Sequence, residues 1–188
     1  LETGDNVVRV FTNPYQFIVH WAQDGTGVTK KIKCAIEDCP LCKKGVKAQY
    51  RWYLGVLDRK EEKKTGVPTP KILDISSQIY VGIKNHFTEP SWGDVRMYDV
   101  NIKKGPKSSQ PLYTVMGIPD KHSFTDEEKS VIKEFIKRVD ISKFVKPSTP
   151  EEIAEKLGVE SSAYTKSETI DEKPIVSEDD FSFVDDDL

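Results

Sequence analysis

Short runs of β-branched and aromatic residues, separated by turn residues, predict a chain built mainly of β-strands. The turn signals at 12–14 (Thr-Asn-Pro) and 25–27 (Gly-Thr-Gly) divide the first of these runs. Strands are expected at residues 7–11, 15–19, 28–34, 50–57, 72–75, 95–102 and 112–116. The segment 58–70 is rich in Lys and Glu, and we expect it to be a mobile, solvated loop.

Apolar residues at helical spacing predict three helices, each with a recognisable start. The first begins at the serine pair 76–77 and runs to about Phe87, with an apolar stripe along one face. Capping boxes at Thr125 and Thr149 begin the other two, and Gly158 ends the last one.

These elements predict an α+β chain that is mainly β. Several short strands with one helix inserted among them suit a five-stranded oligonucleotide-binding (OB) barrel, a fold that presents grooves to single strands. The number of strands alone is equally compatible with other small β-barrels. We expect an OB-like core with flanking helices at residues 1–158 and a flexible acidic tail at 159–188.

One histidine and all three cysteines form the most specific motif of the chain. The ligand candidates are His20, Cys34, Cys39 and Cys42. Four nitrogen and sulfur donors are the number and type that a tetrahedral structural zinc ion takes. The predicted hairpin brings the first two together, and the Cys-Pro-Leu-Cys turn, leading into a short helix at 41–49, closes over them. The sequence therefore predicts one structural zinc ion, in a subdomain at about residues 20–49.

Other uses of these four donors fit less well. A disulfide would leave one thiol over, and a set of buried thiols without metal is the simplest alternative. A hydrolytic zinc ion keeps one position for water, whereas four protein donors close the shell. Nucleobase deaminases carry His-x-Glu before Pro-Cys-x-x-Cys, but His20 is followed by Trp-Ala and Pro40 lies inside the cysteine pair. We therefore expect no enzymatic activity.

Charge is strongly segregated along the chain. Residues 1–150 carry 25 Lys and Arg against 18 Asp and Glu, whereas residues 151–188 carry 3 Lys against 13 Asp and Glu. A basic body suggests a polyanionic ligand, and an acidic tail can compete with that ligand. Charge runs alone favour a solvated surface with a disordered end, and it is the zinc motif that favours the polyanionic ligand. The basic residues that we expect to contact nucleic acid are Lys30, Lys31, Lys33, Arg51, Lys103, Lys104 and Lys107.

Aromatic residues near the zinc motif support a nucleic-acid ligand. A base stacked on an aromatic ring contributes about 1–3 kcal/mol and any base can do so. The candidate rings are Trp21, Tyr50, Trp52 and Tyr53. Alternation along a strand sends Tyr50 and Trp52 to one face and Arg51 and Tyr53 to the other, so one of these faces belongs to the core.

The order of the four ligand candidates is His20, Cys34 and then Cys39-Pro-Leu-Cys42. The segment Gly-Asp-Asn-Val-Val-Arg-Val-Phe precedes them at 4–11, and the pair Trp52-Tyr53 follows them. With these features the chain resembles the T-even phage single-stranded DNA-binding protein family. The resemblance covers about residues 4–158. It implies an OB barrel with an inserted zinc subdomain held by one histidine and three cysteines. It also implies that basic and aromatic side chains line a cleft between zinc subdomain and barrel.

The chain departs from the family pattern in three places. The gap between Cys34 and Cys39 is shorter, and the loop 103–111 has lysines but no aromatic residues. The family's basic N-terminal segment, which drives self-association along the strand, has no counterpart in the opening Leu-Glu-Thr-Gly at 1–4. This opening is expected either of a truncated chain or of a relative without that device.

The acidic tail fits the same resemblance. Its last residues alternate acidic with aromatic or aliphatic side chains, and the family uses such tails to recruit replication and recombination proteins. The partner-binding candidates are Phe181, Phe183, Asp185, Asp186, Asp187 and Leu188. A disordered, solubilising tail is the simpler alternative.

Taken with the resemblance, these features predict a protein that coats single-stranded DNA in the cytoplasm of a bacterial host during phage replication, recombination and repair. No base-edge reader is apparent, so little sequence preference is expected. The alternative is a zinc-bearing protein-interaction or transcription accessory module whose basic face is incidental. No run of about 18 apolar residues is present, so no membrane contact is expected.

Overall fold

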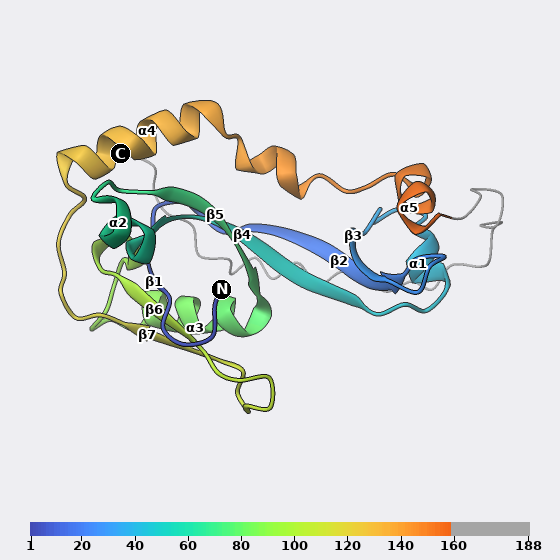
Figure 1. Cartoon of the computed structure of the whole chain (residues 1–188), viewed down its shortest axis with the longest axis horizontal. Helices are drawn as coiled ribbons and strands as arrows, with labels where there is room; N and C mark the ends of the chain where they lie inside the picture. Colours follow the sequence, from blue (N-terminus) through green and yellow to red (C-terminus); the bar gives the residue numbers. More distant parts are fainter. Residues whose placement is uncertain (159–188) are drawn as a thin grey trace. The chain divides into compact units, whose positions relative to one another are not determined.

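The structure is a computed structural model, and it describes residues 1–158 (Figure 1). Its strands are β1 (Val7–Val10), β2 (Tyr15–Gln23), β3 (Thr29–Lys33), β4 (Ala48–Asp58), β5 (Pro70–Ser76), β6 (Val100–Lys104) and β7 (Tyr113–Gly117). Its helices are α1 (Pro40–Lys43), α2 (Arg59–Thr65), α3 (Ser77–Thr88), α4 (Asp126–Arg138) and α5 (Pro150–Leu157), with 3-10 turns η1 (Val95–Met97) and η2 (Ile141–Val145). The expected α+β, mainly β class is confirmed.

The strands form one sheet with the order β3-β2-β4-β1-β6-β7, and β5 pairs with β4. β1 is antiparallel to both β4 and β6, and the hairpins β2–β3 and β6–β7 are antiparallel too. Among the described residues the pairings give an open sheet, and a closed barrel is not seen. None of the described helices has the length and apolar character needed to cross a membrane.

The described chain divides into two compact units. Unit 1 comprises residues 1–15 and 52–144, and unit 2 comprises residues 16–51 and 145–158. The boundaries fall inside β2 and inside β4, so both strands contribute residues to each unit. The predicted zinc subdomain at 20–49 lies within unit 2, and the predicted tail at 159–188 lies outside the described residues.

The main core of unit 1 lies on the face of the sheet that α3 covers. Strand alternation sends Trp52, Leu54 and Val56 into this core, where they meet Ile79 and Ile83 of α3. α3 also packs against β5 and β7 (Figure 1). The apolar spacing along residues 76–88 therefore serves to cover the sheet, as the sequence predicts.

A second apolar cluster of unit 1 lies under α4. Ile132 and Phe135 of α4 pack on Phe11 and Leu57, and the rings of Phe11 and Phe135 meet edge to face at 5.9 Å. Gly55 is needed here, because a Cβ atom at this position would lie 2.5 Å from the Phe11 ring. α4 thus buries the far face of β4 at this end of the strand.

Unit 2 has a small core of its own. Its buried residues are Ile32, Cys34, Cys39, Leu41, Ile153 and Leu157. α5 supplies the last two, and the Gly25 amide donates to the Leu157 carbonyl at 3.0 Å. Two of these six residues are cysteines, so the cluster itself supplies only four large apolar side chains to hold the unit together.

The expected helices at 76–87, 125–139 and 149–158 are confirmed as α3, α4 and α5, and both capping boxes are present. The prediction of a mobile loop at 58–70 is wrong, because Asp58 caps α2 by accepting from the Lys60 and Glu61 amides and Gly66 ends it at φ 75°. The expected strand at 95–102 begins instead with the turn η1, and the helix expected at 41–49 is the single turn α1.

Candidate metal centre and nucleic-acid interface

Three elements of unit 2 bring the four predicted ligands together. His20 lies on β2, Cys34 follows β3, Cys39 is the N-cap of the single turn α1, and Cys42 lies within that turn. Register places His20 opposite Ile32, so both side chains point to the interior of the unit. His20, Cys34 and Cys39 are buried, while Cys42 faces solvent.

Three of the six separations between the donor atoms are close to those that a tetrahedral ion imposes. All four are within 4.8 Å of one another, so the quartet can hold one metal ion. The sulfurs of Cys34 and Cys42 are 3.7 Å apart, and His20 Nε2 lies 3.6 Å from the Cys39 sulfur and 3.4 Å from that of Cys42. Metal–sulfur bonds of about 2.3 Å and metal–nitrogen bonds of about 2.1 Å at tetrahedral angles place the donors about 3.5–3.8 Å apart. The residues therefore fit a metal ion.

Backbone groups orient two of the four donors. His20 Nδ1 lies 3.0 Å from the Val46 carbonyl oxygen, so the proton on Nδ1 is donated there and Nε2 keeps its lone pair for the metal. The Ile36 amide donates to the Cys34 sulfur at 3.3 Å, a bond that stabilises a thiolate. This arrangement is the support that metal ligands typically receive from their surroundings.

The loop between Cys34 and Cys39 has a strained backbone. Ile36 and Asp38 are the described non-glycine residues with positive φ, at 63° and 52°. A β-branched residue in this region costs about 1–2 kcal/mol, and such strain persists only where the surroundings enforce it. Placing two cysteines on one ion across a four-residue gap is a constraint of that kind.

Crowding of the thiols drives their pKa values apart. The hydrogen bond from Cys34, helped by that from His20, lowers the pKa of Cys39 to about 3. The same bond to Cys39, together with burial, raises the pKa of Cys34, and burial also raises that of Cys42. Three thiolates this close repel one another, so a bound cation is what lets all three ionise.

The outward face of the β2–β3 hairpin combines an aromatic ring with lysines. Trp21 is 45% exposed, and register places Lys31 directly opposite it. Lys33 is half-buried and pairs with the buried Val19 on the same face, and the Lys31 ammonium lies 5.7 Å from the ring centroid of the buried Phe17. Trp21 Nε1 donates to Gln49 at 3.1 Å, which fixes the indole. This set, Trp21, Lys31 and Lys33, is called the ribbon face below.

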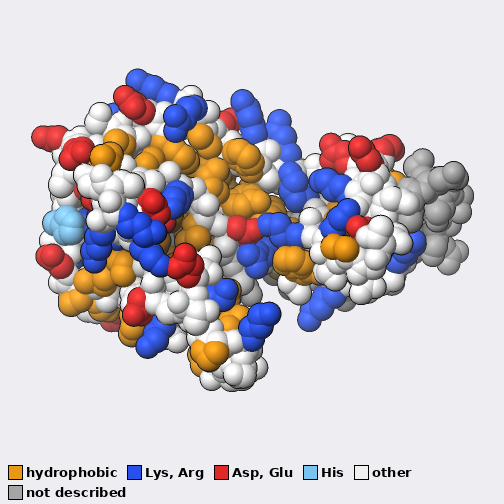
Figure 2. Space-filling view, viewed as in Figure 1, with side chains coloured by type: hydrophobic (Ala, Val, Ile, Leu, Met, Phe, Trp, Pro, Cys, Tyr) orange, Lys and Arg blue, Asp and Glu red, His pale blue; other side chains and the backbone are white. Residues whose placement is uncertain are grey.

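The other predicted contacts of unit 2 lie in different environments. Lys30 forms an ion pair with Asp24 at 2.8 Å and donates to the Lys156 carbonyl, so it supports the hairpin and α5. Tyr50 is 38% exposed on β4, and Arg51 is half-buried. Figure 2 shows basic side chains spread over the visible face of unit 2, with acidic ones gathered at one edge.

Trp52 and Tyr53 belong to opposite faces of β4 in unit 1. Trp52 is buried, and its ring stacks parallel on that of Tyr80 at 4.1 Å, so it is a core residue in this structure. Tyr53 is half-buried and meets Phe144 edge to face at 6.5 Å. Of this aromatic pair only Tyr53 is accessible to a ligand.

The remaining predicted contacts lie at the β6–β7 connection of unit 1. Lys103 and Lys107 are exposed, and Lys104 is half-buried and donates to the Leu1 carbonyl at 3.2 Å. The tail residues Phe181, Phe183, Asp185, Asp186, Asp187 and Leu188 lie outside the described residues.

Sequence reasoning missed one exposed aromatic residue. Phe144 is 49% exposed on η2, beside Tyr53 and next to Lys143 in the chain. Neither helical nor strand periodicity covers residues 140–148, so no element was expected there. The Lys-Phe-Val-Lys run at 143–146 is the only signal that could have drawn attention to it.

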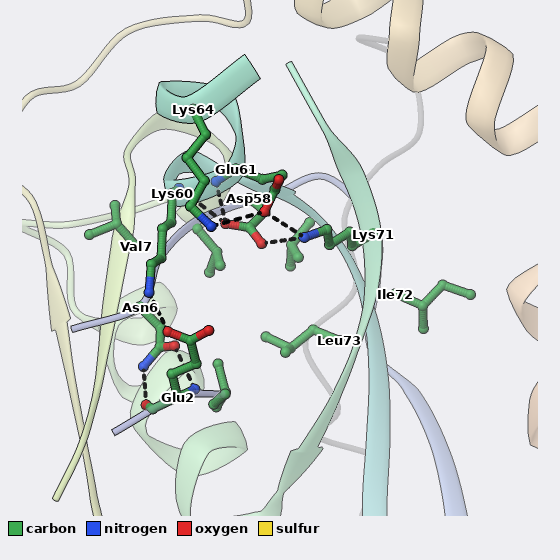
Figure 3. Close-up of a pocket in the computed structure, with 13 residues that line it drawn as sticks. Glu2, Asn6, Val7, Asp58, Lys60, Glu61, Lys64, Lys71, Ile72 and Leu73 are labelled. Carbon is green, nitrogen blue, oxygen red and sulfur yellow. Dashed lines mark hydrogen bonds and ion pairs between the residues drawn. The ribbon is translucent and has the colours of Figure 1, made fainter. Parts of the chain in front are cut away.

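A cavity of about 290 Å³ in unit 1 is a weaker candidate for anion binding (Figure 3). Its apolar floor comes from β1, β4 and β5, and its rim carries three lysines. Lys60 pairs with Glu2, Lys71 with Asp58 at 2.7 Å, and Lys64 with Glu61 at 3.7 Å. Each lysine of this rim is therefore already neutralised within the cavity.

No family model, curated protein or solved structure matches this chain.

Proposed function

We propose that the protein binds single-stranded DNA without catalysis, using a zinc-braced β-hairpin as one of its contact surfaces. The observation that carries this proposal is the ribbon face itself. It places a half-exposed indole opposite one lysine and beside a second, on strands whose inner face carries His20, one of the four candidate ligands. A ring for bases with cations for phosphates is the combination that sequence-independent single-strand binders use.

Zinc is the ion that suits the donor set. One imidazole and three thiolates at tetrahedral separations are typical of structural zinc sites. With four protein donors in place, no position remains for a water molecule to be activated. His20, Cys34, Cys39 and Cys42 would hold the ion, which joins β2, the end of β3 and α1 into one rigid lobe.

The strand order of unit 1 supports an OB-type core. Its path β5-β4-β1-β6-β7, with α3 between β5 and β6, has the order of a partly open five-stranded Greek-key barrel. In that fold the second and third strands and the loops between strands one and two and strands four and five contact the ligand. Here these correspond to β4, β5, the segment that includes unit 2, and the loop carrying Lys107.

Binding should be strongly salt dependent. Each phosphate neutralised on a single strand contributes a slope of about −0.7 to log K against log salt. We expect Lys31→Ala to reduce that slope by about 0.7 and to weaken binding to all sequences alike. Lys63→Ala, an exposed lysine on α2, removes the same charge and should leave the slope unchanged. Fluorescence anisotropy of labelled oligo-dT at several salt concentrations measures both.

Removing the indole should weaken binding more than removing either lysine. Trp21→Ala loses a stacking platform worth about 1–3 kcal/mol, so the dissociation constant for oligo-dT should rise about 5- to 150-fold. Trp21→Phe keeps an aromatic face and should retain most of the affinity. Equal losses in both variants would mean that the indole supports the fold through Gln49 rather than stacking on a base.

The same titration with a matched duplex tests the function as a whole. Preference for the single strand supports the proposal. Failure to bind oligo-dT at low salt would refute the proposed binding of single-stranded DNA and would favour a protein-interaction module. The exposed apolar residues Val28 and Ile36 of unit 2 would then be the first contacts to examine.

A further inference from the structure

A groove of about 670 Å³ lies along the C-terminal half of α4 in unit 1. Its apolar lining comes from Phe11 and Tyr15 at the β1–β2 connection and from Ile136, Val139 and Ile141. Ile136 is 44% exposed, a large apolar side chain left in water at the groove. In Figure 2 hydrophobic side chains are exposed on unit 1 next to α4.

Two lysine side chains also line this groove, next to its apolar residues. Lys133 and Lys137 are one helical turn apart on α4, and both are exposed. No ion pair involves either of them in the part of the chain that the structure describes. The groove's one carboxylate, Asp140, is engaged by Ser142 at 2.6 Å and Lys143 at 3.7 Å. The groove therefore presents uncompensated positive charge beside apolar surface.

This combination selects an acidic peptide with apolar anchors. The accessible lining is largely aliphatic, which suits Phe, Val or Leu side chains better than it suits stacked bases, and bases prefer aromatic platforms. Two lysines at one edge would then meet carboxylates that follow the anchors. A peptide with both features is present in the same chain.

We propose that the groove holds the C-terminal segment 177–188 of this chain. In that segment Phe181 and Phe183 are the anchors, and the carboxylates of 185–187 follow them directly. Phe rings would cover Ile136 and the neighbouring apolar lining, and the aspartates would neutralise Lys133 and Lys137. The inference does not depend on single-strand binding, and it uses no residue of the ribbon face.

Chain length permits this contact however the two units are arranged. From Ile141 in the groove to Val159 the chain has 18 steps, which span at most about 65 Å. From Val159 to Phe181 it has 22 steps, which span up to about 79 Å. The segment 159–181 can therefore span any distance that the segment 141–159 places between the groove and residue 159, so Phe181 can always reach the groove.

Covalent attachment makes even a weak contact effective. A tether of this kind gives an effective concentration of about 1 mM. A segment that binds the groove with a dissociation constant of about 0.1 mM would then occupy it about nine-tenths of the time. We expect the separate peptide to bind only weakly to the intact protein, because the attached segment competes with it.

Amide chemical shifts of the full chain test the proposal. Phe181→Ser/Phe183→Ser should shift the amides around the groove, at 12–15 and 133–141, and leave those of 19–33 unchanged. Tyr164→Ser removes another aromatic residue of the same C-terminal region and should shift neither set. Lys133→Glu/Lys137→Glu should reproduce the shifts of the 12–15 amides, which are remote in sequence from the substituted helix, whereas Arg138→Glu, an exposed α4 cation outside the lining, should leave the 12–15 amides unchanged.

Three outcomes would overturn it. No shift around the groove in the double phenylalanine variant means that the segment does not dock there. Shifts at Trp21, Lys31 and Lys33 mean that it covers the ribbon face instead. Shifts around the groove when oligo-dT is added to the double phenylalanine variant mean that the groove is a nucleic-acid site. Loss of oligo-dT binding alone, with the groove shifts present, would refute the proposed function and leave this inference standing.

Discussion

Cys39→Ser will unfold unit 2 while unit 1 stays folded. Structural zinc contributes apparent free energies of about 10–16 kcal/mol in small zinc peptides, and the apolar core of this unit has only a few residues to replace it. Two of the six buried members of that core are the ligands Cys34 and Cys39 themselves. The strained backbone at Ile36 and Asp38 would relax once the ion no longer holds both cysteines.

Hydrogen exchange of the two units measures this effect separately. Amides of β2 and β3 between residues 17 and 33 should lose protection in Cys39→Ser and after chelation of the intact chain. Amides of β6 and β7 should keep theirs. Ala154→Ser buries a hydroxyl in the same unit without removing a ligand, and it should retain the metal and most of the protection. Unchanged protection of β2 and β3 after complete metal removal would contradict the prediction.

The four residues of the candidate metal centre could be predicted from the sequence, because their spacing alone identifies them. A hairpin turn between His20 and Cys34, followed by a Cys-x-x-Cys turn, leaves few ways to arrange four donors. The backbone groups that orient the ligands could not be predicted from the sequence. The hydrogen bond from His20 to the Val46 carbonyl, for example, depends on the path of the chain after α1. The same holds for α5, whose Ile153 and Leu157 complete the unit from more than a hundred residues away.

Errors in the predicted elements have local physical causes. Helix α2 was missed because charge density suggested a solvated loop, although Asp58 and Gly66 are ordinary start and stop signals. Alternation along β4 correctly divides its residues between two faces, but it cannot tell which face is the core. Trp52 proves to be inside, stacked on Tyr80, and that contact links segments about 30 residues apart. Sequence patterns do not contain such partners.

Arg59→Met will destabilise unit 1 by about 3–5 kcal/mol, the cost of breaking a buried ion pair from one side. Arg59 starts α2 and donates to Asp99 at 3.0 Å, to Glu62 at 2.7 Å and to Glu128 at 2.5 Å. Its loss leaves Glu128, which is 3% exposed, without its arginine partner in the interior. Arg9 cannot substitute, because it already bonds Asp99 and the His122 carbonyl.

The same network makes the loss dependent on pH. Burial raises the pKa of Glu128, but the Thr125 amide and the charge of Arg59 outweigh it, so the pKa lies below its usual range. A lowered carboxyl pKa contributes stability above the unfolded value of about 4.3, and that stability is lost as the pH falls through the folded pKa. Without Arg59 the pKa of Glu128 rises, so protonation relieves the buried charge. The deficit of Arg59→Met should therefore be largest near pH 7 and should shrink toward pH 3.

Denaturant unfolding followed through the exchange of β1 amides reports on this network, because Arg9 lies on β1 and unit 2 does not contribute to the signal. Arg138→Met, an exposed arginine of α4, should change the free energy of unfolding by no more than about 0.5 kcal/mol. A deficit for Arg59→Met that stays constant between pH 7 and pH 3 would show that lost packing, rather than the unpaired carboxylate, is responsible. If the loss of unfolding free energy in Arg59→Met shrinks between pH 7 and pH 3, the ion pairs among α2, α4 and the buried carboxylates stabilise the packing of these helices on the sheet.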